Sequence, residues 1–127
     1  MFNIALDIAN LSDDFNTKIG ALLVREGQII GYGWNHKICD LPDKKGFVHA
    51  EVHALSKGKG DLLICTWACC VDCAKMIVVS GIKKVITSKK DYPKWNSEIE
   101  MGHKVLRDNG VEIEFVDSVS WVGGKWR

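Results

Sequence analysis

The sequence predicts an α/β sandwich built on a mixed β-sheet, in a single domain that spans residues 1–127. Three observations favour this fold class. Two β-rich runs separated by a short turn near the start predict an antiparallel hairpin. After the hairpin, strand-like apolar runs alternate with segments of helical spacing, which is typical of parallel strands joined by helices. A length of 127 residues suffices for one hydrophobic core and is too short for two.

The first expected elements are a short helix and the hairpin. The turn-favouring run at 10–14 ends the helix, and the two strands are expected at 18–24 and 28–34. Gly27 in the turn between them can adopt a positive φ. The apolar residues at helical spacing that predict the helix are Phe2, Ala5, Leu6, Ala9 and Leu11.

The rest of the chain is expected to hold one loop followed by alternating strands and helices. Residues 35–48 show no sustained period and contain several turn formers, so we expect an irregular loop there. Glycines that can end a helix follow each expected helix. Helices are expected at 49–57, 69–80 and 97–109, and strands at 62–65, 85–87 and 111–116.

Composition and charge limit the class of function. Hydrophobic residues make up 46% and charged residues 26% of the chain, which is typical of globular proteins and unlike disordered ones. The formal net charge is only +1, so no global basic field favours binding to nucleic acid. We therefore expect a small-molecule substrate and no nucleic-acid partner.

Neither a membrane span nor a secretion signal is expected. No stretch approaches the roughly 20 apolar residues that cross a bilayer, and the first ten residues lack the regions of a signal peptide. These observations favour a cytoplasmic protein without membrane contact.

Cysteines are concentrated in one short segment. Four of the five lie between Cys65 and Cys73, too close together for a framework of long-range disulfides. This spacing predicts metal or redox chemistry. We expect Cys39 and Cys65 to be inert thiols.

The strongest functional signal is a set of metal-ligating side chains at two expected helix N-termini. Cys70 and Cys73 are three residues apart and share a helix face, so both thiolates can bind one ion. The positive end of the helix dipole favours the thiolate form. Together with His49 they make three ligands, which leaves the fourth tetrahedral position of a zinc ion for water, as in catalytic sites.

Glu51 adds a carboxylate to this set. It follows His49 by two residues, about 200° around an ideal helix, so the two side chains converge only if they cap the helix end. Glu51 could then carry protons instead of binding the metal, while zinc lowers the pKa of water to roughly 7. Such a set of residues suits hydrolytic deamination of an amino-substituted heterocycle.

The pattern H-x-E followed by C-x-x-C resembles the zinc-dependent cytidine/deoxycytidylate deaminase superfamily. The resemblance extends over about residues 17–116 and is nearest to the deoxycytidylate deaminases. The segments that carry it, besides the zinc motif, are Thr17-Lys18-Ile19-Gly20-Ala21, Gly33-Trp34-Asn35, Cys73-Ala74-Lys75-Met76-Ile77 and Ser80-Gly81-Ile82.

The resemblance implies a fold, a reaction and further site residues. The fold would be a three-layer α/β/α sandwich with a five-stranded mixed sheet. The reaction would be conversion of a cytosine nucleotide, dCMP before others, to its uracil form with release of ammonia, with Zn²⁺ as cofactor. Asn35 and Ala50 would contact the substrate, Asn35 through the sugar. A homo-oligomer is also implied.

Three departures from the family pattern leave alternatives open. Cys69 stands where proline is usual, so Cys69 with Cys73 is a second possible ligand pair beside Cys70 with Cys73. His53 stands where deoxycytidylate deaminases usually have asparagine, as in the riboflavin-pathway deaminases, whose longer cysteine motif is absent. The loop after Asn35 also differs, so lysines of that loop (Lys37, Lys44 and Lys45) are candidates for holding a phosphate.

Other functions remain as alternatives. A deaminase of RNA adenosine shares the Gly33-Trp34-Asn35 and His49-Ala50-Glu51 segments, and other nucleosides or free bases are possible substrates. A zinc-binding module without catalysis would need the metal ligands but not Glu51. Trp67, just before the cysteines, could either stack on a base or pack in the core.

Overall fold

A computed structural model describes residues 1–14, 17–67, 69–88, 96–116, 121–122 and 125–126 of the chain. The elements follow in the order α1 (Phe2–Ala9), β1 (Gly20–Arg25), β2 (Gln28–Trp34), β3 (His36–Lys37), a 3-10 turn (Pro42–Lys44), β4 (Phe47–Val48), α2 (Ala50–Leu55), β5 (Leu62–Cys65), α3 (Val71–Val79), β6 (Lys84–Ser88), α4 (Asn96–Asp108), β7 (Glu112–Val116), β8 (Trp121–Val122) and β9 (Lys125–Trp126).

The central sheet has five strands in the order β2-β1-β5-β6-β7. β1 pairs antiparallel with β2 and with β5, whereas β5, β6 and β7 run parallel. The predicted hairpin is therefore confirmed, and the sheet is mixed. Its turn has positive φ at both Glu26 (51°) and Gly27 (80°), the backbone of a type I′ turn.

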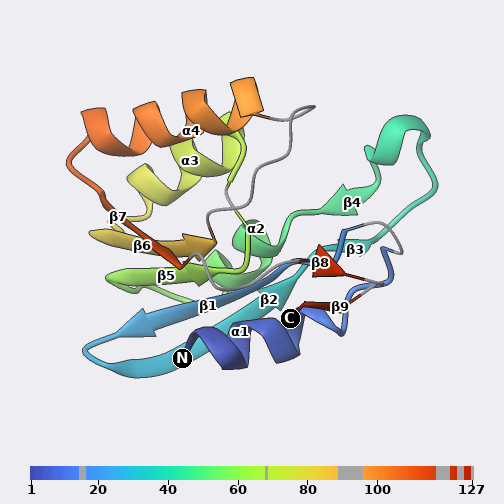
Figure 1. The fold of residues 1–127 in the computed structure, drawn as a ribbon, viewed down its shortest axis with the longest axis horizontal. Helices are drawn as coiled ribbons and strands as arrows, with labels where there is room; N and C mark the ends of the chain where they lie inside the picture. Colours follow the sequence, from blue (N-terminus) through green and yellow to red (C-terminus); the bar gives the residue numbers. More distant parts are fainter. Residues whose placement is uncertain (15–16, 68, 89–95, 117–120, 123–124, 127) are drawn as a thin grey trace.

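Helices cover both faces of this sheet (Figure 1). Alternate residues of β1 point to opposite faces, because side chains alternate along a strand. Ala21 and Leu23 lie in the core shared with α2, α3 and α4, whereas Leu22 and Val24 pack with Ala5 of α1. The predicted three-layer α/β/α sandwich with a five-stranded mixed sheet is thus confirmed.

The segment 35–48 is more ordered than the sequence predicts. His36 pairs with Val48 and Lys37 with Phe47, so β3 and β4 form a short antiparallel ladder in place of the expected irregular loop. A ladder of two residues per strand is too short to produce a detectable period, which explains the wrong expectation. The ladder returns the chain to the end of β2 and delivers it to the start of α2.

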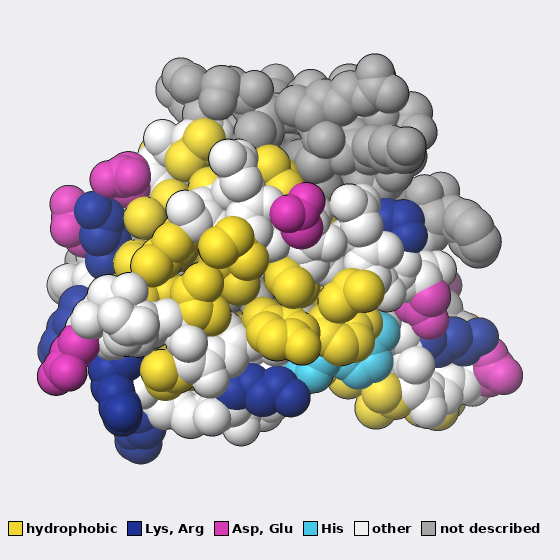
Figure 2. Space-filling model, turned by 90° about the horizontal axis from the view of Figure 1, so that it is seen from below, with side chains coloured by type: hydrophobic (Ala, Val, Ile, Leu, Met, Phe, Trp, Pro, Cys, Tyr) yellow, Lys and Arg dark blue, Asp and Glu magenta, His cyan; other side chains and the backbone are white. Residues whose placement is uncertain are grey.

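Hydrophobic side chains gather on the outer surface on the side of α1 and β2 (Figure 2). Among the exposed ones are Ile4 on α1, Leu11 just after α1 and Tyr32 on β2. The ring of Trp34 lies between Tyr32 and the ring of His53 of α2, with centroid distances of 6.1 and 4.6 Å. No helix within the described ranges is long and apolar enough to cross a membrane.

Candidate active site

The N-terminus of α2 places His49 and Glu51. His49 is the N-cap residue, with extended backbone angles (φ −72°, ψ 148°), and Glu51 lies in the first helical turn. The cap position predicted for this pair is confirmed. Because His49 lies outside the helix, the 200° separation of an ideal helix does not apply, and both residues line one cleft.

The N-terminus of α3 places the two cysteines. Cys70 is the N-cap residue (φ −75°, ψ 173°), and its Sγ accepts a hydrogen bond from the backbone N–H of Cys73 at 3.5 Å. Glu98 of α4 supports the same helix end, because its Oε1 accepts from the N–H of Val71 at 3.2 Å. The N-terminus of α3 is therefore stabilised by one hydrogen bond to its own cap residue and by another to α4.

The two helix ends meet at a cluster of possible metal ligands. Nδ1 of His49 lies 3.0 Å from Sγ of Cys73 and 3.6 Å from Sγ of Cys70, and the three ligand atoms are all within 4.8 Å of one another. Tetrahedral zinc with ordinary bond lengths would separate nitrogen from sulfur by about 3.5 Å. The cluster fits a zinc ion, with three protein ligands.

Hydrogen bonding within the cluster favours the thiolate form of one cysteine. The hydrogen bond with Cys73 lowers the pKa of Cys70 to about 4, and the hydrogen bond with Cys70 raises the pKa of His49 to about 9. The pKa of Cys73 is raised, because its thiol donates to Cys70. These shifts favour the anionic form of Cys70, which is the form that binds metal.

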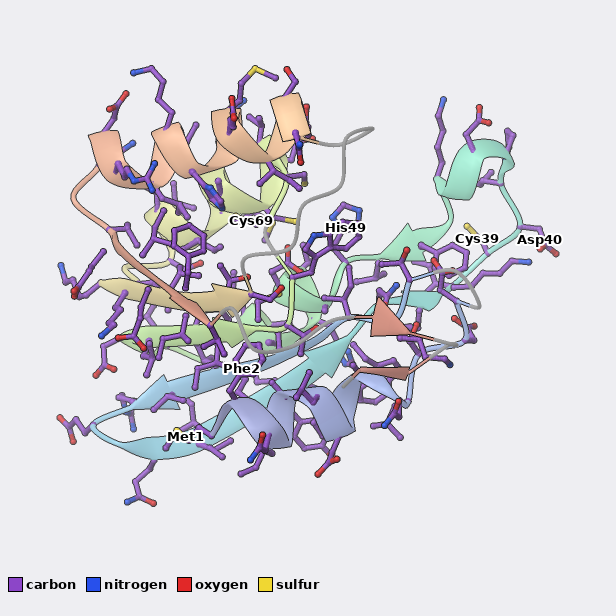
Figure 3. The ribbon with its side chains drawn as sticks, in the orientation of Figure 1. Met1, Phe2, Cys39, Asp40, His49 and Cys69 are labelled. Atoms are coloured by element: carbon purple, nitrogen blue, oxygen red, sulfur yellow. The ribbon has the colours of Figure 1, made fainter. Side chains whose placement is uncertain are left out.

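Cys69 lies outside this cluster. It is 4% exposed and contributes to the hydrophobic core, and burial raises the pKa of its thiol well above the ordinary value. Among the described residues, the ligand atoms that come together belong to His49, Cys70 and Cys73. Figure 3 shows Cys39 apart from His49, on the loop between β3 and β4.

Glu51 is almost completely buried, with 4% of its surface exposed. Burial raises the pKa of its carboxyl, because desolvation disfavours the charged form. The Sγ of Cys65 lies 3.5 Å from Oε1 of Glu51 and donates a hydrogen bond to it. The expectation that Cys65 is merely an inert thiol missed this contact, which pattern reasoning could not find because the residues are fourteen apart in separate elements.

Asn35 also lines the cleft, and its amide is engaged with the backbone. Its Oδ1 accepts from the N–H of Ile19 and its Nδ2 donates to the carbonyl of Thr17, both at 2.8 Å. The side chain thereby ties the end of β2 to the segment that precedes β1. Its predicted contact with the sugar of a substrate stays a prediction.

Ala50 is fully buried and is not among the described residues that line the cleft. It packs against β2, where a Cβ added at Gly33 would come within 2.7 Å of the Ala50 carbonyl oxygen. The structure thus places Ala50 in the contact between α2 and the sheet. Its role in substrate binding stays a prediction.

The cleft above this cluster has a volume of about 710 Å³, within the range of small-molecule sites. Phe47 and Trp67 give it aromatic walls, and Ile99 and Met101 of α4 add apolar surface. The described lining residues include several carboxylates and no lysine or arginine. This composition suits a flat heterocyclic ring.

The other candidates from the sequence lie elsewhere. Lys37 forms an exposed ion pair with Asp40 on its own loop, and neither Lys37 nor Lys45 is among the described lining residues. The side chain of Lys44 lies outside the described part of the structure. His53 points to the sheet edge, where its Nδ1 accepts from the N–H of Trp34 at 3.2 Å.

A cluster of three zinc ligands beside a buried carboxylate, on two helix ends of an α/β/α sandwich, defines the class of zinc-dependent hydrolytic deaminases. The family described as "Cytidine and deoxycytidylate deaminase zinc-binding region" matches residues 1–89. The chain belongs to the cytidine and deoxycytidylate deaminase family.

Solved and curated relatives agree with this assignment. The dCMP deaminase of cyanophage S-TIM5, in complex with dCMP and dUMP, is 31% identical, with a TM-score of 0.76 over 91% of this chain and 93% of that chain. The deoxycytidylate deaminase of Enterobacteria phage T2 is 33% identical over 61% of this chain and 43% of its own length. The riboflavin biosynthesis protein RibD of Aquifex aeolicus is 34% identical over 78% of this chain and 28% of its own length. The chain thus spans less than half the length of the latter two.

Proposed function

We propose that this chain converts dCMP to dUMP and ammonia by zinc-dependent hydrolysis, with the zinc held by His49, Cys70 and Cys73. The observation that carries the proposal is the burial of Glu51 on the wall of a cleft that also contains His49 and Cys70. The cyanophage dCMP deaminase, similar over nearly its whole length, supports the choice of dCMP.

In this proposal Glu51 moves the protons of the reaction. A zinc ion in a three-ligand site activates water near neutral pH. Glu51 takes one proton from the attacking water as a C4–O bond forms and delivers it to N3 of the ring. It then takes the second proton, from the hydroxyl on C4, and delivers it to the amine, so that C4=O forms, the C4–N bond breaks and ammonia leaves. Burial raises the pKa of the Glu51 carboxyl, which favours its acceptance of a proton from water.

The remaining cleft residues would position the substrate. Phe47 and Trp67 would contact the base, and Asn35 would reach the sugar. The described lining supplies no lysine or arginine for a phosphate, so phosphorylated and unphosphorylated substrates need direct comparison. The implied homo-oligomer stays a prediction.

Similarity to RibD favours a second candidate function. The run from His49 to Ala54 has histidine at position 53, as in the riboflavin-pathway deaminases, and the matching region of RibD is 34% identical. A relative in Buchnera aphidicola is named diaminohydroxyphosphoribosylamino-pyrimidine deaminase. The diaminohydroxyphosphoribosylaminopyrimidine in that name is therefore the competing substrate. It differs from dCMP in the ring that must fit the cleft.

A substrate panel tests the proposal. The purified zinc-loaded chain is assayed for ammonia release with dCMP, dCTP, CMP, deoxycytidine, cytidine, cytosine, guanine and the riboflavin-pathway pyrimidine. We expect kcat/KM for dCMP to exceed that for deoxycytidine by at least about tenfold. Turnover of the riboflavin-pathway pyrimidine alone would support the second candidate, and absence of turnover on every cytosine compound would refute the first.

A variant of Glu51 serves as the control for catalysis. Glu51→Gln keeps the side-chain volume, so it should keep zinc, whereas loss of the proton carrier should lower kcat by at least about a hundredfold. Metal content and kcat are measured on the same preparation. A variant that binds zinc and retains a near-normal rate would exclude the proton-carrier role.

A further inference from the structure

Glu51 separates the cleft from a second, interior space. On its inner side lies a narrow void lined largely by apolar side chains, among them Leu63, Ile77 and Val85, together with Cys65. This void is too narrow to hold a water molecule, so water cannot solvate the carboxylate from within. The inner side of Glu51 therefore depends on a protein group for hydrogen bonding.

Cys65 provides that group. Its Sγ lies 3.5 Å from Oε1 of Glu51, and the residue is 1% exposed. Cys65 ends β5, where it pairs with Ala21 of β1 on one side and with Thr87 of β6 on the other. The thiol is thus held by a central strand of the sheet, in a different element from Glu51.

We infer that Cys65 is a positioning residue, whose S–H donates to Oε1 of Glu51 and holds the carboxylate so that its other oxygen serves the cleft. The inference rests on the proposed function of Glu51 as proton carrier. It also explains why a thiol suits this position. A thiol is a weak donor, so it can orient the carboxylate without strongly stabilising the anion.

The chemistry of the thiol is consistent with this role. Burial raises the pKa of Cys65 well above the ordinary value, so the group keeps its proton and remains a donor. The Sγ of Cys65 does not belong to the cluster of metal-ligand atoms from His49, Cys70 and Cys73. Replacement of Cys65 should therefore change the orientation of the Glu51 carboxylate and leave metal binding intact.

The contact itself can be tested without substrate. The infrared S–H stretching band of Cys65 is identified as the band that disappears in Cys65→Val. Because hydrogen bonding lowers the stretching frequency, Glu51→Ala should shift this band to higher frequency. An unshifted band in folded Glu51→Ala would overturn the inference even if the deaminase activity is confirmed, and absence of deaminase activity would leave this readout valid.

Kinetics then test the consequence. Cys65→Val deletes the donor and should lower kcat about tenfold with KM and zinc content unchanged, since small displacements of a catalytic group are costly. Cys65→Ser restores a donor and should stay within about threefold of the wild-type kcat. Cys65→Ala replaces the valine variant if valine disturbs folding, as judged by thermal unfolding.

A double-mutant cycle separates positioning from packing. In the Glu51→Ala background the carboxylate is gone, so Cys65→Val should cause no further loss of the residual rate. An equal loss in both backgrounds, or a serine variant as slow as the valine variant, would show that Cys65 acts only through core packing and would overturn the inference.

Discussion

Individual residues at the two helix ends serve structure and chemistry together. Cys70 is both the N-cap of α3, where its Sγ accepts from the N–H of Cys73, and a member of the ligand cluster. His49 occupies the equivalent cap position of α2. Both caps have extended backbone, which directs the side chains away from their own helices toward each other. The geometry of the site thus follows from where the two helices begin.

The choice between Cys69 and Cys70 gives a prediction at this scale. Cys70→Ser keeps an oxygen that can cap α3 but removes a thiolate ligand, so the folded variant should lose most of its bound zinc. Cys69→Ala is the matched control and should retain zinc, because Cys69 lies in the core. The measurement is zinc content per chain after purification. Loss of zinc from the Cys69 variant alone would contradict the assignment.

At the scale of elements, glycines set how closely helices approach the sheet. A Cβ at Gly33 of β2 would lie 2.4 Å from the backbone nitrogen of Ala54 in α2. On the opposite face, a Cβ at Gly20 of β1 would lie 2.2 Å from the carbonyl oxygen of Ala5 in α1. In both cases the obstacle is helix backbone, which cannot rotate away. Of these two helices, α1 and α2, only α2 carries site residues.

This asymmetry gives a matched pair of variants. Gly33→Ala and Gly20→Ala should each lower the free energy of unfolding by about 1–3 kcal/mol, as overpacked sites do. Only Gly33→Ala should also weaken zinc binding and lower activity, because it displaces the helix that begins after His49. Thermal unfolding and competition with a zinc chelator measure the two effects. Equal zinc affinity in both variants would show that the site does not depend on the seating of α2.

Elements with a clear sequence signal could be predicted, and short or long-range features could not. The apolar runs that form β1, β2 and β5 were predictable because burial of a strand requires apolar residues along it. The metal ligands were predictable because binding one zinc ion fixes their spacing. The ladder of His36 and Lys37 with Val48 and Phe47 was not, since two residues carry no period. The contact of Cys65 with Glu51 depends on how α2 packs on β5, which local sequence does not encode.

For the molecule as a whole, the two helical layers are unequal. In the described part of the chain, α1 is the helix that packs on one face of the five-stranded sheet, and its side carries the exposed hydrophobic side chains of Figure 2. The opposite layer of α2, α3 and α4 encloses the larger core and both helix ends of the site. The site thus lies on the side of the larger core, where α4 also contributes to the wall of the cleft.

Burial of histidine in this larger layer predicts how stability depends on pH. His103 of α4 packs edge-on against Phe115 at 5.4 Å, and its Nε2 is buried without a hydrogen-bond partner in the described part of the chain. Burial, with a smaller effect of Arg107, lowers its pKa from the ordinary value of 6.5. As pH falls below about 6.5, the unfolded chain gains a proton that the folded chain does not bind, so the free energy of unfolding decreases.

The contribution of neutral His103 to the free energy of unfolding is therefore fully present above about pH 6.5. This contribution is lost as the pH falls toward the lowered pKa of the folded state. His103→Phe keeps an aromatic ring against Phe115 and removes the titrating group, so its thermal midpoint should decline less than that of the wild type between about pH 7.5 and pH 5.5. Both proteins are measured at the same zinc concentration, because acid also protonates the metal ligands and their loss is common to both. Parallel curves for the two proteins would show that burial of His103 does not contribute to the acid sensitivity.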